Sequence, residues 1–390
     1  MPPSNAIAAA SHHDPYPYYR RLLAGPPLQF DAGLGLWIAS RANVIREVLD
    51  HPLCQVRPAQ EPVPASIAGS SAGAIFARLI RMNEGPAHAA PKQAIGQALG
   101  ALDLDAVATS THQFARMLSA RQALHHGAAL TSWIFDLPTW VVADLLGVRH
   151  AELPHMAASM ADFVRCLSPL STAAQLADAS TAAQALSARC GQLAPGGLLA
   201  DLHRQAARMG WVDQDAILAN LIGLLSQTHE ATAGLIGNSI VALLKQPHLQ
   251  ARLRADPHLA AALVQEVARF DPPVQNTRRF VAQATSVAGV ALQPGASILL
   301  LLAAAGRDAQ AFPEPDVLML ERPAHCPIGF GHGRHACPGQ ALAMRIATSA
   351  VQHLLSVPLV LDPGLLGWTW RASANARLPQ FFTRSSKEQP

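Results

Sequence analysis

The order of hydrophobic and polar positions along the chain predicts a mainly helical protein with small sheets. From about residue 76 to residue 270 the pattern is mostly helical and rich in alanine and leucine. Short β-like runs occur only around residues 280–302 and 358–382, and residues 28–38 predict a hairpin. Residues 60–75 predict a mobile loop. No boundary splits the chain, so we expect a single domain over residues 1–390, frayed at 1–13 and 385–390.

One predicted helix is much longer than the others. Asp213 and Asp215 are N-terminal signals and Pro247 ends the pattern, with about 33 proline-free residues between them. At 1.5 Å per residue such a helix extends about 50 Å and could cross the whole molecule. Its middle, residues 223–237, is apolar except for one polar cluster. That cluster fits a functional site or a core helix with a satisfied polar patch, and the pattern alone does not separate the two.

Composition excludes several classes of protein. Half of the residues are hydrophobic and 14% are charged, which excludes a disordered chain. A net charge of +3 without a basic block, and 5% aromatic residues, argue against a nucleic-acid partner. The apolar runs are too short to span a bilayer and no signal peptide is recognisable, so we expect a cytoplasmic protein without a membrane anchor. Five scattered cysteines fit a reducing compartment rather than a disulfide framework.

The strongest chemical signal is the segment FGHGRHACPG at residues 330–339. Its glycines permit a tight loop and the close approach of a flat ligand. Cys337 is followed by Pro338 and by a predicted helix from Gly339 to about Ser356. The thiol therefore lies at a helix N-terminus, where the helix dipole and free N–H groups stabilise a thiolate.

Other patterns are weaker signals. Glu266 and Arg269, in an apolar helix, share one face and favour a buried ion pair, with an exposed pair as the alternative. Ser71 lies in a GxSxG segment, but the proline-rich residues before it make a poor strand for a hydrolase nucleophile. A zincin motif starting at His229 lacks its second histidine. The spacing disfavours a zinc site made from His325, Cys326, His332, His335 and Cys337.

These segments, together and in this order, resemble a cytochrome P450, a heme-thiolate monooxygenase of the soluble bacterial type. The cysteine loop matches FGxGxHxCxG at every fixed position, and Glu266 and Arg269 match the ExxR pair. Residues 273–279 and 306–315 match further segments of the family, and the resemblance runs from Asp14 to about Pro379. It implies the cytochrome P450 fold, which is mainly α with small β-sheets and a long central helix over the heme.

The resemblance also implies the roles of individual residues. The cofactor would be heme b, iron protoporphyrin IX, with Cys337 as the thiolate ligand of the iron. Glu266 and Arg269 would be structural, braced by Arg322. Lys92 stands where the family usually has the arginine of HxxxR, so it keeps the charge without the guanidinium fork, and Pro91 puts the local helix in doubt. The remaining heme contacts would be His88, Arg279, His335, Phe330, Gly331 and Gly339.

The central helix departs from the family pattern of small–Gly–x–acid–Thr. The acid is present as Glu230, but Ala231 replaces the alcohol and Gln227 replaces the small residue. The alcohol orders water for proton delivery, a form of positioned acid–base catalysis. Thr232 or a substrate hydroxyl could replace it, and our hypothesis is that Gln227 and a polar group of the substrate do so together. The alternative is an enzyme that is poorly coupled or uses peroxide.

Substrate contacts are expected from mainly apolar segments. These predict a small to medium hydrophobic substrate with one or two polar groups. Electrons would come from a ferredoxin and an NAD(P)H–ferredoxin reductase, steered by Arg334, Arg345 and Lys92. The alternatives are a peroxide-driven, desaturating, coupling or rearranging heme-thiolate enzyme, and a non-catalytic heme-binding sensor. The expected contact segments are residues 60–82, 160–185, Leu224, Gln227, Ala231, Val274–Thr277 and Ala374–Pro379.

Overall fold

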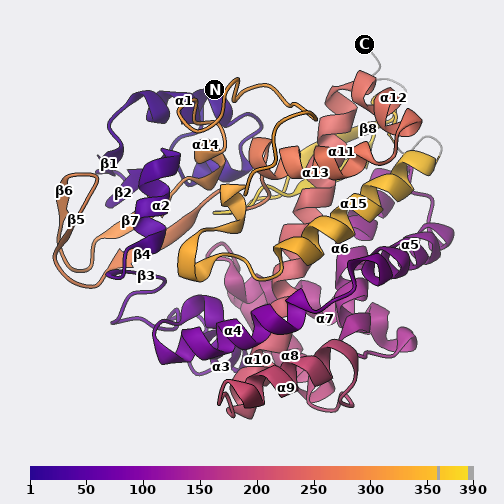
Figure 1. Ribbon diagram of the computed structural model, residues 1–390, viewed down its shortest axis with the longest axis horizontal. Helices are drawn as coiled ribbons and strands as arrows, with labels where there is room; N and C mark the ends of the chain where they lie inside the picture. The colour runs from indigo at the N-terminus through magenta and orange to yellow at the C-terminus, as the bar shows by residue number, and fades with distance from the viewer. Residues whose placement is uncertain (358–360, 385–390) are drawn as a thin grey trace.

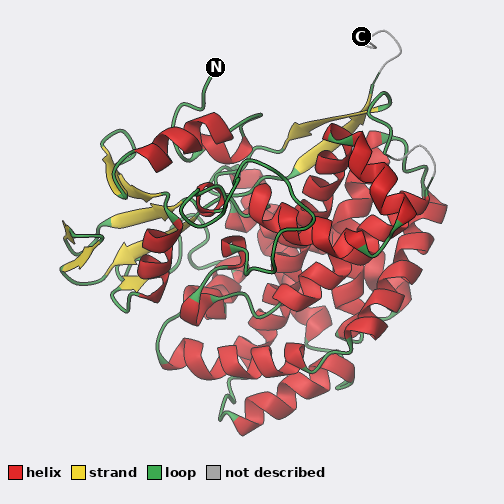
Figure 2. Ribbon diagram, turned by 45° about the horizontal axis from the view of Figure 1, so that its top comes forward, coloured by secondary structure: helices red, strands yellow, loops and turns green. Residues whose placement is uncertain are grey.

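The computed structural model describes residues 1–357 and 361–384 and is mainly helical, as the sequence predicts. Figure 2 shows helices filling most of the molecule, with most strands gathered on one side of it. In the described part of the chain, none of the helices is long and apolar enough to cross a membrane. The helices are α1 Tyr16–Ala24, α2 Ala42–Asp50, α3 Ser71–Arg78, α4 Pro86–Gly100, α5 Leu104–Arg121, α6 Gly127–Leu145, α7 Leu153–Phe163, α8 Ala173–Cys190, α9 Gly197–Arg208, α10 Gln214–Gln227, α11 Ala233–Lys245, α12 Pro247–Ala255, α13 Leu259–Phe270, α14 Leu302–Ala305 and α15 Gln340–Ser356.

The strands form one mixed sheet and two hairpins. The five-stranded sheet has the order β1-β2-β7-β4-β3. β1 and β2 pair antiparallel with Phe30 opposite Trp37, which confirms the predicted hairpin, whereas β2 and β7 run parallel. The strands are β1 Leu28–Asp31, β2 Leu36–Ala39, β3 Cys54–Gln55, β4 Thr277–Val281, β5 Thr285–Val287, β6 Val290–Leu292, β7 Ser297–Leu300, β8 Leu366–Trp370 and β9 Pro379–Thr383.

The predicted long central helix is confirmed as α10 and α11, joined by a π-helical turn at Thr228–Thr232 (Figure 1). It begins where the sequence predicts, because the Asp213 carboxylate accepts a hydrogen bond from the Ala216 N–H at 3.0 Å. Every residue of α11 from Ala233 to Leu244 is buried. The π-helical turn coincides with the polar cluster, and such turns occur frequently at functional sites.

The expected fraying of residues 1–13 is wrong. Ala8–Ser11 form a 3₁₀ turn, and Ala6 and Ala9 are fully buried beside Tyr19. The carbonyls of His12 and His13 accept hydrogen bonds from the buried Arg377 guanidinium. Small alanine side chains permit this close packing, and the arginine needs the carbonyls as partners. The expected fraying at 385–390 lies outside the described residues.

The predicted loop at 60–75 ends earlier than expected. Helix α3 begins at Ser71, and the Ser70 hydroxyl caps it by accepting a hydrogen bond from the Gly73 N–H at 3.1 Å. A serine at this position satisfies an N–H group that the first helical turn leaves free. Ser71 is therefore a residue of the first helical turn. A hydrolase elbow requires a strand directly before the serine, and Ser71 does not follow one.

Candidate functional site

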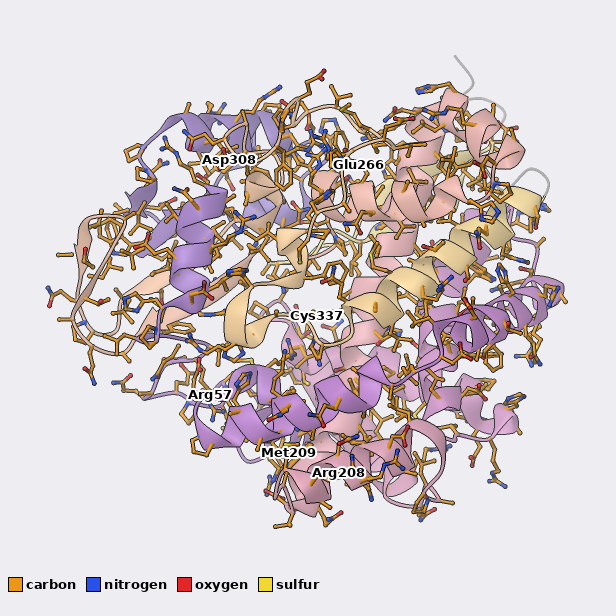
Figure 3. The ribbon with its side chains drawn as sticks, viewed as in Figure 1. Arg57, Arg208, Met209, Glu266, Asp308 and Cys337 are labelled. Atoms are coloured by element: carbon orange, nitrogen blue, oxygen red, sulfur yellow. The ribbon has the colours of Figure 1, made fainter. Side chains whose placement is uncertain are left out.

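Cys337 lies on the loop that leads into α15, near the centre of the view in Figure 3. Gly331 and Gly333 have φ of 78° and 59°, in the left-handed region that favours glycine. A Cβ on Gly333 would come within 2.0 Å of the Asp50 carboxylate. The Cys337 N–H donates to the Phe330 carbonyl at 2.7 Å, which closes the loop. The glycines thus allow a turn that leaves the Cys337 side chain exposed, unlike Cys54, Cys166 and Cys190.

The surroundings of the Cys337 sulfur act in opposite directions on its pKa. Removal from bulk water raises this pKa, while the Gly339 N–H and the Lys92 ammonium lower it. The net direction is upward, so the helix N-terminus does not by itself stabilise the thiolate as the sequence argument expects. A coordinated metal ion would supply the missing positive charge, because it deprotonates a thiol outright.

Lys92 is positioned by α4, which continues through Pro91 despite the doubt raised by that proline. Its Nζ donates a hydrogen bond to the carbonyl of Ala336, next to Cys337. Partial burial lowers the pKa of this lysine, and the Cys337 sulfur opposes that shift. The ammonium therefore supports the cysteine loop directly.

A group of basic side chains surrounds the single carboxylate Glu84. The Oε2 atom of Glu84 lies 3.1 Å from Arg334 Nε and 3.2 Å from His335 Nε2. These partners overcome the effect of burial and lower the pKa of Glu84 to about 2. The ring of His88 lies against that of His335, with centroids 4.1 Å apart. Burial and the neighbouring cations lower the pKa of His88 to about 4, so it is neutral at pH 7.

Arg279, on β4, is a member of this group with an unsatisfied donor. Its side chain is 5% exposed and its Nε has no hydrogen-bond partner. Burial lowers its pKa to about 10, and Glu84 is the one carboxylate that counteracts this. A buried guanidinium with a free donor needs an anion. The residues therefore fit a group that carries carboxylates, such as the heme propionates that the resemblance implies.

Glu266 and Arg269, on α13, form a buried ion pair, not an exposed one. Two nitrogens of Arg269 lie 2.9 and 2.6 Å from the two carboxylate oxygens of Glu266. Arg322 Nε lies 2.9 Å from Glu266, as the resemblance implies, and the Met319 N–H donates to it at 3.0 Å. Arg269 also donates to the carbonyls of Gly306, Pro315 and Val317. The pair thus fastens α13 to the segment 306–322 that precedes the cysteine loop.

The π-helical turn presents the residues predicted for proton transfer. The Gln227 amide nitrogen donates to the Gly223 carbonyl at 2.9 Å, so its N–H is bound to its own helix. Ala231 and Glu230 are half-buried, whereas Thr232 is only 2% exposed. His229 is buried and hydrogen-bonds Thr139 through Nδ1 at 3.0 Å. Thr232 is therefore enclosed, whereas Gln227, just before the turn, and Glu230, within it, remain accessible.

Two segments expected to touch the substrate are joined. Val274 forms an isolated antiparallel bridge with Ala376, and the Gln275 N–H donates to the Asn375 carbonyl at 2.8 Å. Thr277 is held in β4 opposite Leu300, and Leu224 packs against the main hydrophobic core. The loop 273–277 and the turn 374–378 therefore form one continuous wall.

Charged side chains also lie close to the segments that are expected to contact the substrate. Arg81, in the 3₁₀ turn Ile80–Met82, and Arg371, directly after β8, both act on Glu230. Arg371 Nη1 lies 3.6 Å from Glu230 Oε1. Burial raises the pKa of Glu230, and the two arginines oppose that shift. Neither arginine belongs to a motif, and Glu84 was missed for the same reason, so only the folded chain brings these charges together.

The basic residues expected to steer a redox partner are mostly engaged. Arg334 donates to Glu84 and to carbonyls of residues 49, 50, 51 and 54, and Lys92 donates to Ala336. Both residues support the cysteine loop, so their charges are not free for a partner. Arg345 is 37% exposed and lies 3.3 Å from the exposed Asp105. Of the three, Arg345 alone keeps an accessible charge.

Comparison with known proteins agrees with this arrangement. The profile of the family "Cytochrome P450" matches residues 198–357. Protein AknT of Streptomyces galilaeus is 31% identical over 382 residues, which cover 91% of this chain and 84% of that relative. The vitamin D(3) 25-hydroxylase of Pseudonocardia autotrophica is 39% identical over 169 residues, 43% of this chain and 42% of that relative, so this chain spans about two fifths of its length. The crystal structure of CalO2 is similar in fold, with a TM-score of 0.83 at 24% identity, covering 98% of this chain and 97% of that one.

Proposed function

Because this chain belongs to the cytochrome P450 family, we propose that it is a heme-thiolate monooxygenase that inserts one oxygen atom from O₂ into a small to medium hydrophobic organic substrate. The observations that carry the proposal are the exposed Cys337 thiol and the buried Arg279, whose Nε has no hydrogen-bond partner. When bound, heme supplies the electron transfer and O₂ chemistry, and a thiolate ligand favours O–O cleavage. The five free cysteines, two of them exposed, fit a reducing cytoplasmic location.

The family implies heme, and we propose heme b held in the following way. Cys337 would ligate the iron, and Lys92 would keep the loop in place through Ala336. Arg279 and His335 would bind the propionates, with neutral His88 as a further hydrogen-bonding group. Phe330, Gly331 and Gly339 would form the loop wall next to the sulfur, and a Cβ on Gly331 would lie only 3.2 Å from the His335 carbonyl oxygen.

Replacing Arg279 with leucine is expected to speed the loss of heme about tenfold or more. The variant removes a charge-assisted hydrogen bond to a propionate, and such bonds are worth about 1.5–3 kcal/mol. The rate can be measured by transfer of heme to an excess of a heme-free acceptor protein. Arg278→Leu is the matched control, because Arg278 is exposed on the same strand. Equal rates of loss from both variants would contradict the role of Arg279.

We infer that Glu230 and Gln227 handle the proton. Burial raises the pKa of Glu230, so this carboxyl can hold and release a proton nearer to neutral pH than an exposed glutamate can. One N–H of the Gln227 amide is bound to Gly223, which leaves its second N–H to donate to water or substrate and its Oε1 to accept a hydrogen bond from them. The Ala231 methyl cannot take part, so a polar group of the substrate would complete the path.

Gln227→Ala is expected to lower the yield of product per NAD(P)H by a factor of about two to ten, with a matching rise in peroxide. The factor follows if one neutral hydrogen bond of about 0.5–1.5 kcal/mol is lost. Product and hydrogen peroxide per NAD(P)H consumed are measured together. Gln214→Ala, at the exposed start of α10, is the control. An unchanged yield in Gln227→Ala would refute the proposed relay.

The electron donors proposed are a ferredoxin and its NAD(P)H-dependent reductase, with Arg345 as a contact on the face near α15. The second candidate is a peroxide-driven enzyme, which Ala231 favours because it removes the alcohol of the family pattern. Turnover with NAD(P)H, ferredoxin and reductase is compared with turnover by hydrogen peroxide. Product from the first system alone supports the monooxygenase, product from peroxide alone supports the second candidate, and no product from either favours a heme-binding sensor.

A further inference from the structure

Three charged side chains from separate segments of the chain lie near the π-helical turn of the central helix. Glu230 comes from the π-helical turn, Arg81 from the turn Ile80–Met82, and Arg371 from the end of β8. Arg371 Nη1 and Glu230 Oε1 are 3.6 Å apart, too far for a hydrogen bond but close enough for an ion pair. Arg81 and Glu230 also influence each other electrostatically. Two positive charges thus face one negative charge.

Arg81 is held against the central helix and not on a free loop. The Asn220 side chain on α10 accepts a hydrogen bond from the Ile80 N–H at 2.9 Å and donates to the Arg78 carbonyl at 2.9 Å. Gln227 lies two turns further along the same face of α10, and the π-helical turn follows it. The backbone just before Arg81 is therefore fixed to the helix that leads to Glu230.

One donor of the Arg81 guanidinium lacks the partner that a buried donor normally has. Its Nε is buried without a hydrogen-bond partner, and no ion pair includes Arg81 in residues 1–357 and 361–384. Arg269 provides the contrast, since Glu266 and three carbonyls satisfy its guanidinium. An arginine carries five N–H donors, and leaving them unsatisfied away from water costs free energy. A protein can retain an unsatisfied donor of this kind in its unliganded state when a bound ligand satisfies that donor.

We propose that the substrate carries a carboxylate, which Arg81 and Arg371 bind beside Glu230. This inference rests on the proposed function and names the class of its substrate. The guanidinium fork matches the two oxygens of a carboxylate. With Glu230 ionised, the three side chains leave one net positive charge, which a monoanion neutralises and a phosphate dianion exceeds. The rest of the substrate is apolar, because Leu224 and Val274 belong to the hydrophobic clusters nearby.

The test is the binding of matched acids and esters to the ferric, heme-loaded protein. The probes are dodecanoate with methyl dodecanoate, and 4-butylbenzoate with its methyl ester, and their Kd is measured by calorimetry. At least one acid is expected to bind about tenfold more tightly than its ester, since a charge-assisted pair is worth more than a neutral contact. If neither acid binds more tightly than its ester, the proposal is overturned.

Three variants assign the effect to the arginines. Arg81→Leu and Arg371→Leu are each expected to weaken binding of the preferred acid about tenfold and that of its ester less than twofold. Arg81→Lys is expected to restore part of the preference, since it keeps the charge without the fork. Arg78→Leu is the matched control, because Arg78 is exposed and pairs with the exposed Asp215 at 3.5 Å. Equal losses of acid and ester in Arg81→Leu, or the same loss in Arg78→Leu, would overturn the assignment.

This test separates the inference from the proposed function. A protein that prefers the acids but forms no product with any electron donor would support the carboxylate site and contradict the monooxygenase. A protein that oxidises an uncharged compound and does not distinguish acid from ester would support the monooxygenase and contradict the carboxylate site. The unliganded Arg81→Leu protein is also expected to unfold at a temperature equal to or higher than that of the parent, because it loses an unpaired charge.

Discussion

Replacing Cys337 with serine is expected to reduce turnover by more than about a hundredfold. Mutating a residue that hydrogen-bonds to a metal ligand typically lowers metal affinity or activity 10–100-fold, so loss of the ligand itself should lower activity further. A serine hydroxyl is almost the same size, but its oxygen is a harder and less electron-rich donor than a thiolate. Turnover with NAD(P)H, ferredoxin and reductase measures the loss. The visible spectrum of the reduced protein with carbon monoxide reports the change of ligand separately.

Cys326→Ser is the control for this change. Cys326 is also exposed, lies ahead of the same loop, and contacts Gln340 at 3.7 Å. Its variant is expected to keep the parent's spectrum and turnover. A Cys337→Ser protein with the parent's spectrum would exclude Cys337 as the ligand and remove the basis of the proposed function.

Glu266→Ala is expected to lower the free energy of unfolding by about 3–5 kcal/mol, the usual cost of removing one partner of a buried ion pair. The change leaves Arg269 and Arg322 without their shared carboxylate, and both side chains are almost completely enclosed. It also removes the acceptor of the Met319 N–H, so the segment before the cysteine loop loses an anchor. Urea titration gives the free energy, and heme content after purification reports the effect on the loop.

Glu321→Ala provides the comparison for a surface pair on the same segment. Glu321 is 65% exposed and pairs with the exposed Arg252, so its loss is expected to lower the free energy of unfolding much less than the loss of Glu266 does. A similar fall in the free energy of unfolding in both variants would show that the buried pair of Glu266 stabilises the protein no more than the exposed pair does. A Glu266→Ala protein that is as stable as the parent would contradict the structural role of the pair.

The features that could be predicted from sequence are those fixed by short stretches of chain. The cysteine loop depends on glycines whose left-handed φ angles no other residue adopts as easily, so the motif carries its own geometry. The ion pair of Glu266 and Arg269 follows from their spacing on one helix. The central helix follows from its length without proline and from the cap at Asp213.

The features that could not be predicted depend on contacts between distant segments. Glu84 meets Arg334, and Glu230 meets Arg371, only after the chain has folded. A lone charge in a sequence does not reveal its partner, so nothing in the predicted contact segment 60–82 indicated that Arg81 acts on Glu230. Arg334 was expected to offer a free charge to a redox partner, but it is bound to backbone carbonyls that no motif indicates.

Arg377 connects the start of the chain to the wall of the substrate site. It donates to the carbonyls of His12 and His13, pairs with Asp271 at 2.9 Å, and stacks on Trp370 at 3.6 Å. Its own N–H binds the Pro273 carbonyl, next to the bridge between Val274 and Ala376. A deletion that removes His12 and His13 would therefore act as a remote mutation of the proposed substrate site, because Arg377 would lose two of its carbonyl partners.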